Sequence, residues 1–199
     1  VVFGFVIFVF AFWFVTRELV FAQPGTTSGW TWLWYALPAF CVWLFYLLSF
    51  WPGSMSPDSL DQWKQVLNGK LRDWHPAFHT MTIWLVTRIK LSPATVAVSQ
   101  ILALGSTIGW ALAVLQRHGV PRAVLWVTSC VVALLPVNGF IVVTLWKDVA
   151  YSIVLLILAM YIFQIVMQKG VWLKQPRNWF YLGVVLALVS LYRHNGIVP

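Results

Sequence analysis

The sequence predicts an all-α membrane protein with several spanning helices in one domain, and three observations support this fold class. Hydrophobic residues make up 61% of the chain and charged residues only 9%, whereas soluble domains carry roughly a quarter charged residues. The apolar residues form runs long enough to cross a bilayer, which takes roughly 20 residues. The charged residues lie mostly in short segments between these runs. So much apolar surface needs lipid to cover it.

About six apolar runs are expected to be transmembrane helices. Five of them meet the length that a bilayer requires: residues 30–52, 94–116, 122–145, 148–167 and 179–199. The sixth, residues 1–15, reads as the second half of a spanning helix and lacks the basic leader and small-residue cleavage site of a signal peptide. We therefore expect residues 1–199 to be a single transmembrane domain and part of a longer chain.

Residues 77–87 are apolar but too short to cross the bilayer. With its flanks this segment offers about fourteen residues, or ~21 Å at ~1.5 Å per residue, against a hydrocarbon core of ~30 Å. We expect it to lie flat along the membrane interface as a short helix. Residues 53–93 then form one extracytoplasmic loop with two interfacial helices.

The first interfacial helix is predicted from the residues at its two ends. Ser56 suits the N-cap, Pro57 suits the first helical position, and Asn68-Gly69 is a stop signal. One face of this helix is apolar and carries Leu60, Trp63 and Leu67. An apolar face opposite charged residues is typical of an amphipathic helix on a membrane surface.

The net charge of +8 does not indicate a nucleic-acid partner, because basic residues in short loops set the orientation of membrane spans. With residues 77–90 flat, six basic residues less Glu18 give one face +5, and seven basic residues less four aspartates give the other +3. The same totals result if residues 77–90 cross, so the length of that segment decides the arrangement. We expect the face with the aspartates to be extracytoplasmic.

Three of the four aspartates lie in this outer loop: Asp58, Asp61 and Asp73. Asp58 and Asp61 have a structural explanation, because the helix dipole favours acids in a first turn by ~0.3–1 kcal/mol. A catalytic carboxylate is the alternative, and both explanations stay open at this point.

Two histidines of the loop, His75 and His79, are four residues apart and suit one side of a helix. They are a weak metal signal, since the metalloprotease signature needs Glu beside the first His, where this chain has Pro76. We expect His79 to hydrogen-bond to headgroups or loop backbone, and His75 to contact a substrate.

Further polar residues lie where two apolar runs reach the same face. Lys147 and Asp148 begin an otherwise charge-free span, and an ionisable group within a span costs ~2.5–3.5 kcal/mol and is a functional candidate. The alternative is an interfacial pair in which Lys147 snorkels. Arg193 precedes His194 and Asn195. Its guanidinium suits a phosphate, and its alternative role is an interface anchor.

These motifs, taken in order, resemble those of the GT-C superfamily of membrane glycosyltransferases. This superfamily uses polyprenyl-phosphate-linked sugars and includes protein O-mannosyltransferases and lipid A aminoarabinose transferases. The motifs are PGSMSPDSLDQWKQVLNG, DWHPAFH, LWKD and YRHNG. They look in particular like those of uncharacterised bacterial members, and the resemblance covers residues 30–199.

The resemblance implies that Asp58 is catalytic and that Asp148 is the second acidic position. Many relatives carry Asp-Glu at the first motif, where this chain has Asp58-Ser59, so the division of labour between Asp58 and Asp61 stays open. Transfer needs a carboxylate at the acceptor hydroxyl and cations near the departing phosphate. The cations would be Arg193 and Lys147. The expected substrate contacts are His75, Lys147, Asp148, Arg193, His194 and Asn195.

The resemblance also implies the partners. The donor would be a polyprenyl-phosphate-linked sugar, and the acceptor a glycan, lipid or protein of the cell envelope, at the outer face of a bacterial plasma membrane. Some members use a divalent cation, Mg²⁺ or Mn²⁺, for which Asp58 and Asp148 are the candidate ligands. Two rival functions remain: a multispan transporter, whose charges would line a pathway, and a metal-dependent membrane hydrolase that uses His75 and His79. Charges collected at one face favour the transferase.

Overall fold

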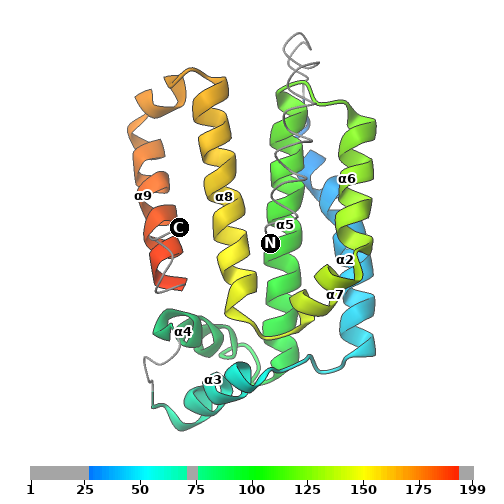
Figure 1. Cartoon of the computed structure of the whole chain (residues 1–199), viewed down its shortest axis with the longest axis vertical. Helices are drawn as coiled ribbons and strands as arrows, with labels where there is room; N and C mark the ends of the chain where they lie inside the picture. Colours follow the sequence, from blue (N-terminus) through cyan, green and yellow to red (C-terminus); the bar gives the residue numbers. More distant parts are fainter. Residues whose placement is uncertain (1–26, 71–75, 193–199) are drawn as a thin grey trace.

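The structure is a computed structural model that describes residues 27–70 and 76–192 (Figure 1). This part of the chain is all-helical, and its extended segments form only one isolated bridge. The elements are α2 (Thr31–Ser49), α3 (Pro57–Asn68), α4 (Ala77–Val86), α5 (Pro93–Arg117), α6 (Arg122–Leu134), α7 (Pro136–Val143), α8 (Lys147–Met167), η1 (Val171–Lys174) and α9 (Pro176–Tyr192).

The helices form a bundle with a short layer at one end. Helices α2, α5, α6, α8 and α9 run side by side, while α3 and α4 lie together below them (Figure 1). We call this the α3–α4 end. The connection from α7 to α8 lies at the same end, and the connections from α5 to α6 and from α8 to α9 lie at the opposite end (Figure 1). The segment expected to lie flat thus forms α4, beside α3.

The described part contains fewer spanning helices than expected. Three helices, α2, α5 and α8, are long and apolar enough to cross a membrane, and the bent pair α6 and α7 makes a fourth if it is one span. Six spans are therefore not supported. Residues 1–15 lie outside the described residues. Helix α9 has 17 described residues, which reach ~26 Å against a core of ~30 Å.

The span expected over residues 122–145 is broken at Pro136. Helix α6 ends at Leu134, and α7 begins at Pro136 with a bend of 60° between them. A proline disfavours helical backbone in the preceding residue, and Leu135 has extended angles of φ −60° and ψ 115°. The Asn138 side chain amide donates 2.9 Å to the Val132 carbonyl, so the break supplies a partner for one of the carbonyls that it leaves.

The closest packing in the bundle is between α2 and α5, because glycines of α5 face α2. A Cβ atom on Gly109 would collide with the carbonyl oxygen of Trp32 and lie 2.9 Å from the Ala36 Cβ. A Cβ atom on Gly105 would lie 2.5 Å from the nearest atom of the Phe40 ring. Small residues at a crossing let two membrane helices approach and gain van der Waals contact.

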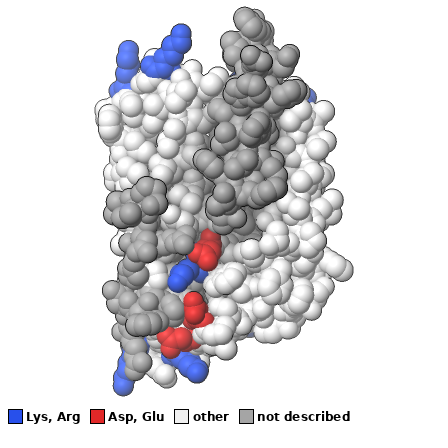
Figure 2. Space-filling view, in the orientation of Figure 1, with Lys and Arg blue, Asp and Glu red and all other residues white. Residues whose placement is uncertain are grey.

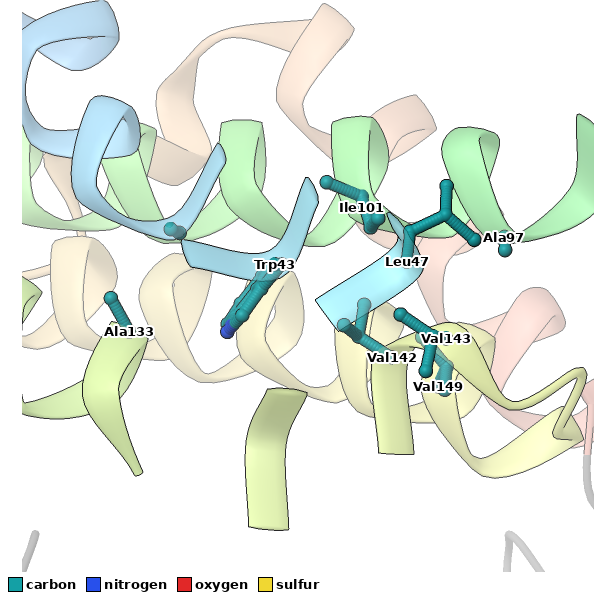
Figure 3. Close-up of a cluster of buried hydrophobic side chains, with 9 residues drawn as sticks. Trp43, Leu47, Ala97, Ile101, Ala133, Val142, Val143 and Val149 are labelled. Atoms are coloured by element: carbon teal, nitrogen blue, oxygen red, sulfur yellow. The ribbon is translucent and has the colours of Figure 1, made fainter. Parts of the chain in front are cut away.

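The main core lies next to this contact and joins five helices (Figure 3). Trp43 of α2 is fully buried at its centre. The other members of this core are Ala39, Leu47, Ala97, Ile101, Ala133, Val142, Val143 and Val149. The core therefore fixes α7 and the start of α8 against α2 and α5, close to the α3–α4 end.

The helix predicted from Ser56 to Gly69 is confirmed. The Ser56 hydroxyl accepts a hydrogen bond from the Ser59 backbone N–H at 3.2 Å, and Gly69 ends the helix at φ 64°, a conformation that favours glycine. The face of α3 that packs on the protein carries Ser59, Gln62, Gln65 and Val66. Of the predicted apolar face, Leu60 and Leu67 are exposed, as on a membrane-surface helix, whereas Trp63 is half-buried and packs against a cluster that includes Val66.

Candidate functional site

The start of α3 is fixed to the segment that leads into α8. Ser54 pairs with Thr144 in a short parallel bridge. The Ser54 N–H donates to the Val143 carbonyl, and the Leu145 N–H donates to the Ser54 carbonyl, both at 3.0 Å. The Ser59 hydroxyl donates to the Leu145 carbonyl. The first turn of α3 is therefore held against residues 143–145.

Gln100 of α5 holds the same segment from the other side. Its buried side chain amide donates to the carbonyls of Val142 at 2.9 Å and Thr144 at 2.8 Å. Non-helical backbone inside an apolar protein needs such partners, because an unpaired buried carbonyl costs about as much as a lost hydrogen bond. Gln100 was not predicted as a site residue, because its signal in the sequence was no more than an amide within an apolar run.

Three candidate charged residues lie close to the junction between Ser59 and Leu145. Asp58 is the second residue of α3 and is exposed, while Lys147 and Asp148 are the first two residues of α8 and are half-buried. Since Ser59 contacts Leu145, the two helix starts lie close to each other. The structure thus brings together charges that are about ninety positions apart in the sequence.

The acidic side chains of the described part are those of Asp58, Asp61 and Asp148. Figure 2 shows red acidic groups on the lower half of one face, near basic groups in blue, and no red on the upper half of the same face. Asp61 is half-buried, and its carboxylate accepts 2.8 Å from the Gln65 side chain amide. Asp58 is the more accessible of the two α3 carboxylates.

The dipole explanation fits Asp58 and Asp148 but not Asp61, which lies beyond the first turn of α3. Asp58 lies in the first turn of α3 and Asp148 in the first turn of α8, where an acid is stabilising by ~0.3–1 kcal/mol. The two explanations are compatible, since a carboxylate held at a helix start also has a defined position.

His79, which we expected to hydrogen-bond to headgroups or loop backbone, lies buried in a polar contact between α3 and α4. Its side chain is 2% exposed, and its Nδ1 lies 3.0 Å from the Gln62 carbonyl oxygen. The Gln62 amide nitrogen donates 3.2 Å to the Thr80 hydroxyl. This assignment makes Nδ1 of His79 the donor. Sequence reasoning missed Gln62, although polar residues at 59, 62 and 65 repeat on one helical face.

The last described residue of α9, Tyr192, packs on α4. Its ring lies 4.9 Å from the Phe78 ring in an edge-on arrangement, and its hydroxyl lies 3.1 Å from that of Thr82. The end of α9 therefore lies at the α3–α4 end, beside the helix that carries His79.

Five candidate residues lie outside the described residues, and their roles stay predictions: Asp73, His75, Arg193, His194 and Asn195. Within residues 27–70 and 76–192, no three His, Cys, Asp or Glu side chains are grouped so that they could hold a metal ion. Asp58 and Asp148 remain the candidate carboxylates for a divalent cation.

Comparisons with family models, curated proteins and solved structures found no match to this chain. The part of the chain that the structure describes is all-helical, with three or four apolar helices of membrane-spanning size and a group of polar side chains at one end.

Proposed function

We propose that this chain is a membrane glycosyltransferase of the GT-C type, which moves a sugar from a polyprenyl-phosphate carrier to an acceptor of the cell envelope. The observation that carries the proposal is the junction between Ser59 and Leu145. It fixes the first turn of α3, which carries the accessible Asp58, against the segment that leads into Lys147 and Asp148 at one end of the apolar bundle. A lipid carrier presents its phosphate at this depth, and an acceptor reaches it from water.

The proposed step uses these groups in distinct roles. The Asp58 carboxylate takes the proton of the acceptor hydroxyl, whose oxygen then attacks the anomeric carbon of the sugar. The bond from that carbon to the phosphate oxygen breaks, and the electron pair leaves with the polyprenyl phosphate. Lys147 stabilises the negative charge on the departing phosphate.

Two further residues complete the proposed site. Asp148 orients the donor or, with Asp58, binds a divalent cation that would offset phosphate charge. Arg193 is the next residue after Tyr192, which packs on α4, and its planar guanidinium suits bidentate binding of phosphate.

The orientation of the site is a further part of the proposal. The opposite end of the bundle carries exposed basic residues and no acidic residue within the described part: Arg117, Arg122, Lys169, Lys174 and Arg177. The α3–α4 end carries five basic residues as well, so the enrichment of Lys and Arg in cytoplasmic loops does not choose between the two ends. Because the proposed acceptor belongs to the cell envelope, we infer that the α3–α4 end faces outwards and the opposite end faces the cytoplasm of a bacterial cell.

Lipids that copurify with the full chain test this proposal. Mass spectrometry of the extract should find polyprenyl phosphate with the wild-type protein, and less of it with Lys147→Gln. The matched control is Lys174→Gln, an exposed lysine at the opposite end, which should retain the wild-type amount. Wild-type protein that carries no polyprenyl phosphate, even after incubation with farnesyl phosphate, would count against the transferase.

A transporter is the second candidate, and the bend between α6 and α7 favours it. Discontinuous helices in transporters expose backbone groups to substrate. Here the Asn138 amide already donates a hydrogen bond to the Val132 carbonyl. The Gln100 amide donates to the carbonyls of Val142 and Thr144. These carbonyls are satisfied within the protein, so the break serves the fold, and the transferase remains the better-supported function.

A further inference from the structure

A second feature of the α3–α4 end is a cavity of about 670 Å³ between the end of α3 and the residues that follow α4. Its lining includes Leu67, Trp84, Arg88, Ile89, Lys90 and Leu91. A smaller cavity of about 280 Å³ shares Val66, Gly69 and Trp84 with it. Asp58 is ten positions before Asn68 on α3, or ~15 Å along the helix axis, so this cavity is separate from the candidate site.

The lining alternates cationic and aliphatic side chains. Arg88 and Lys90 are exposed, and the neighbouring Ile89 and Leu91 are 85% and 61% exposed. None of the described acidic residues lines the cavity. The described lining is therefore positively charged, and its aliphatic groups lie within one residue of the cations.

Trp84 contacts one of the two cations of the lining. The Arg88 guanidinium lies over the Trp84 ring, 4.0 Å from its centroid. Stacking on an aromatic face holds a guanidinium in place while its N–H groups stay available to an anion. Tryptophan and arginine are also residues that anchor proteins at the membrane interface.

We propose that this cavity binds the headgroup of an anionic phospholipid of the surrounding bilayer. The phosphate lies between Arg88 and Lys90, and the start of the acyl chains lies along Ile89 and Leu91. The cationic and the aliphatic side chains of the lining are on neighbouring residues. The ligand that suits both is an anionic amphiphile. The proposal is independent of sugar transfer, because it uses neither Asp58 nor the start of α8.

Lipid binding to the purified full chain in detergent tests the proposal by native mass spectrometry. The probes are dioleoyl phosphatidylglycerol and dioleoyl phosphatidylcholine, which share acyl chains and differ in headgroup charge. The wild-type protein should bind phosphatidylglycerol about tenfold or more tightly. Since one basic residue near an anionic surface contributes roughly fivefold in affinity, Arg88→Gln/Lys90→Gln should abolish this preference.

The matched control removes the same charges elsewhere. Lys174→Gln/Arg177→Gln changes two exposed basic residues at the opposite end and should keep the preference. Ile89→Ser/Leu91→Ser should weaken the binding of both lipids alike and leave the ratio of the two affinities unchanged. Lys90→Gln alone should lose part of the preference for phosphatidylglycerol. This single variant replaces Arg88→Gln/Lys90→Gln if the double variant does not fold.

Competition distinguishes the sources of the phosphate. Glycerol phosphate has the headgroup without acyl chains and should not displace phosphatidylglycerol at equal concentration. Four results would overturn the proposal: an unchanged preference in Arg88→Gln/Lys90→Gln, an equal loss in the control variant, displacement by glycerol phosphate, or farnesyl phosphate binding that is lost in Arg88→Gln/Lys90→Gln and kept in Lys147→Gln. The last of these would assign the cavity to a polyprenyl carrier.

Discussion

The Ser59 hydroxyl donates a hydrogen bond to the Leu145 carbonyl, 86 positions further along the chain. Both residues are buried, with exposed fractions of 1% and 0%. This contact joins the first turn of α3 to the residue two positions before Lys147. Together with the pairing of Ser54 and Thr144, it fixes the start of α3, which carries Asp58, against the residues that precede α8.

Replacing Ser59 tests whether this link positions the site. Ser59→Ala leaves the buried Leu145 carbonyl without its hydroxyl partner, which costs about 1–3 kcal/mol. We expect a lower unfolding midpoint in detergent and a loss of sugar transfer greater than the loss of folded protein. Ser49→Ala is the matched control, because the exposed Ser49 hydroxyl donates only within its own helix, to the Phe45 carbonyl. An unchanged midpoint in Ser59→Ala would show that the link is not needed.

The contact between α2 and α5 gives a second prediction, in which two glycines respond oppositely to alanine. A methyl group on Gly109 collides with the Trp32 backbone, and overpacking costs typically ~1–3 kcal/mol. At Gly183 of α9 no atom lies within 4 Å of the new methyl group, and alanine in a helix is favoured over glycine by roughly 0.5–1 kcal/mol. The midpoint temperature of unfolding in detergent should fall for Gly109→Ala and should stay the same or rise for Gly183→Ala.

Local signals in the sequence were sufficient for part of this fold. Helix α3 follows from Ser56, Pro57 and Gly69, because caps and glycine stops act within a few residues. The bend between α6 and α7 was missed, although Pro136 was visible, because hydropathy alone treats the apolar residues on both sides as one span. Proline in a membrane helix either kinks or ends it, and the choice depends on partners such as the Asn138 side chain.

The sequence predicted which end of the bundle carries the candidate site, but not the contacts that hold its residues in place. Charges at the ends of apolar runs indicated one end of the bundle, and Asp58, Lys147 and Asp148 lie there. The pairing of Ser54 with Thr144 and the contacts of Gln100 are tertiary, and no periodicity in the sequence reports them. His79 was expected at the interface, but its partner Gln62 is 17 positions away, beyond the range of a helical pattern.

Cysteine labelling tests the inferred orientation. In a background without Cys41 and Cys130, the cysteines of the described part, one cysteine is introduced at Asn68 or at Gln175, both exposed. An impermeant thiol reagent added to intact cells should modify the cysteine at position 68, and the one at 175 only after lysis. Labelling of position 175 alone in intact cells would invert the orientation and place the acidic site in the cytoplasm.

The last prediction concerns Asp58, the exposed carboxylate at the start of α3. Asp58→Asn keeps the size of the side chain and removes the base. Loss of a general base costs about 10²–10⁴-fold in rate, whereas loss of a first-turn acid costs at most ~1 kcal/mol of stability. The variant should therefore fold and insert normally but scarcely transfer sugar, measured as labelled product from a polyprenyl-phosphate donor.

Asp61→Asn is the matched control for this variant, since it makes the same chemical change three positions further along the same helix. Asp61 is half-buried and its carboxylate already accepts from Gln65, so its loss should reduce transfer much less. Full activity in Asp58→Asn with an inactive Asp61→Asn would move the base to Asp61. Activity retained in both variants would contradict the transferase mechanism itself, because the described part of α3 has no third carboxylate to replace them.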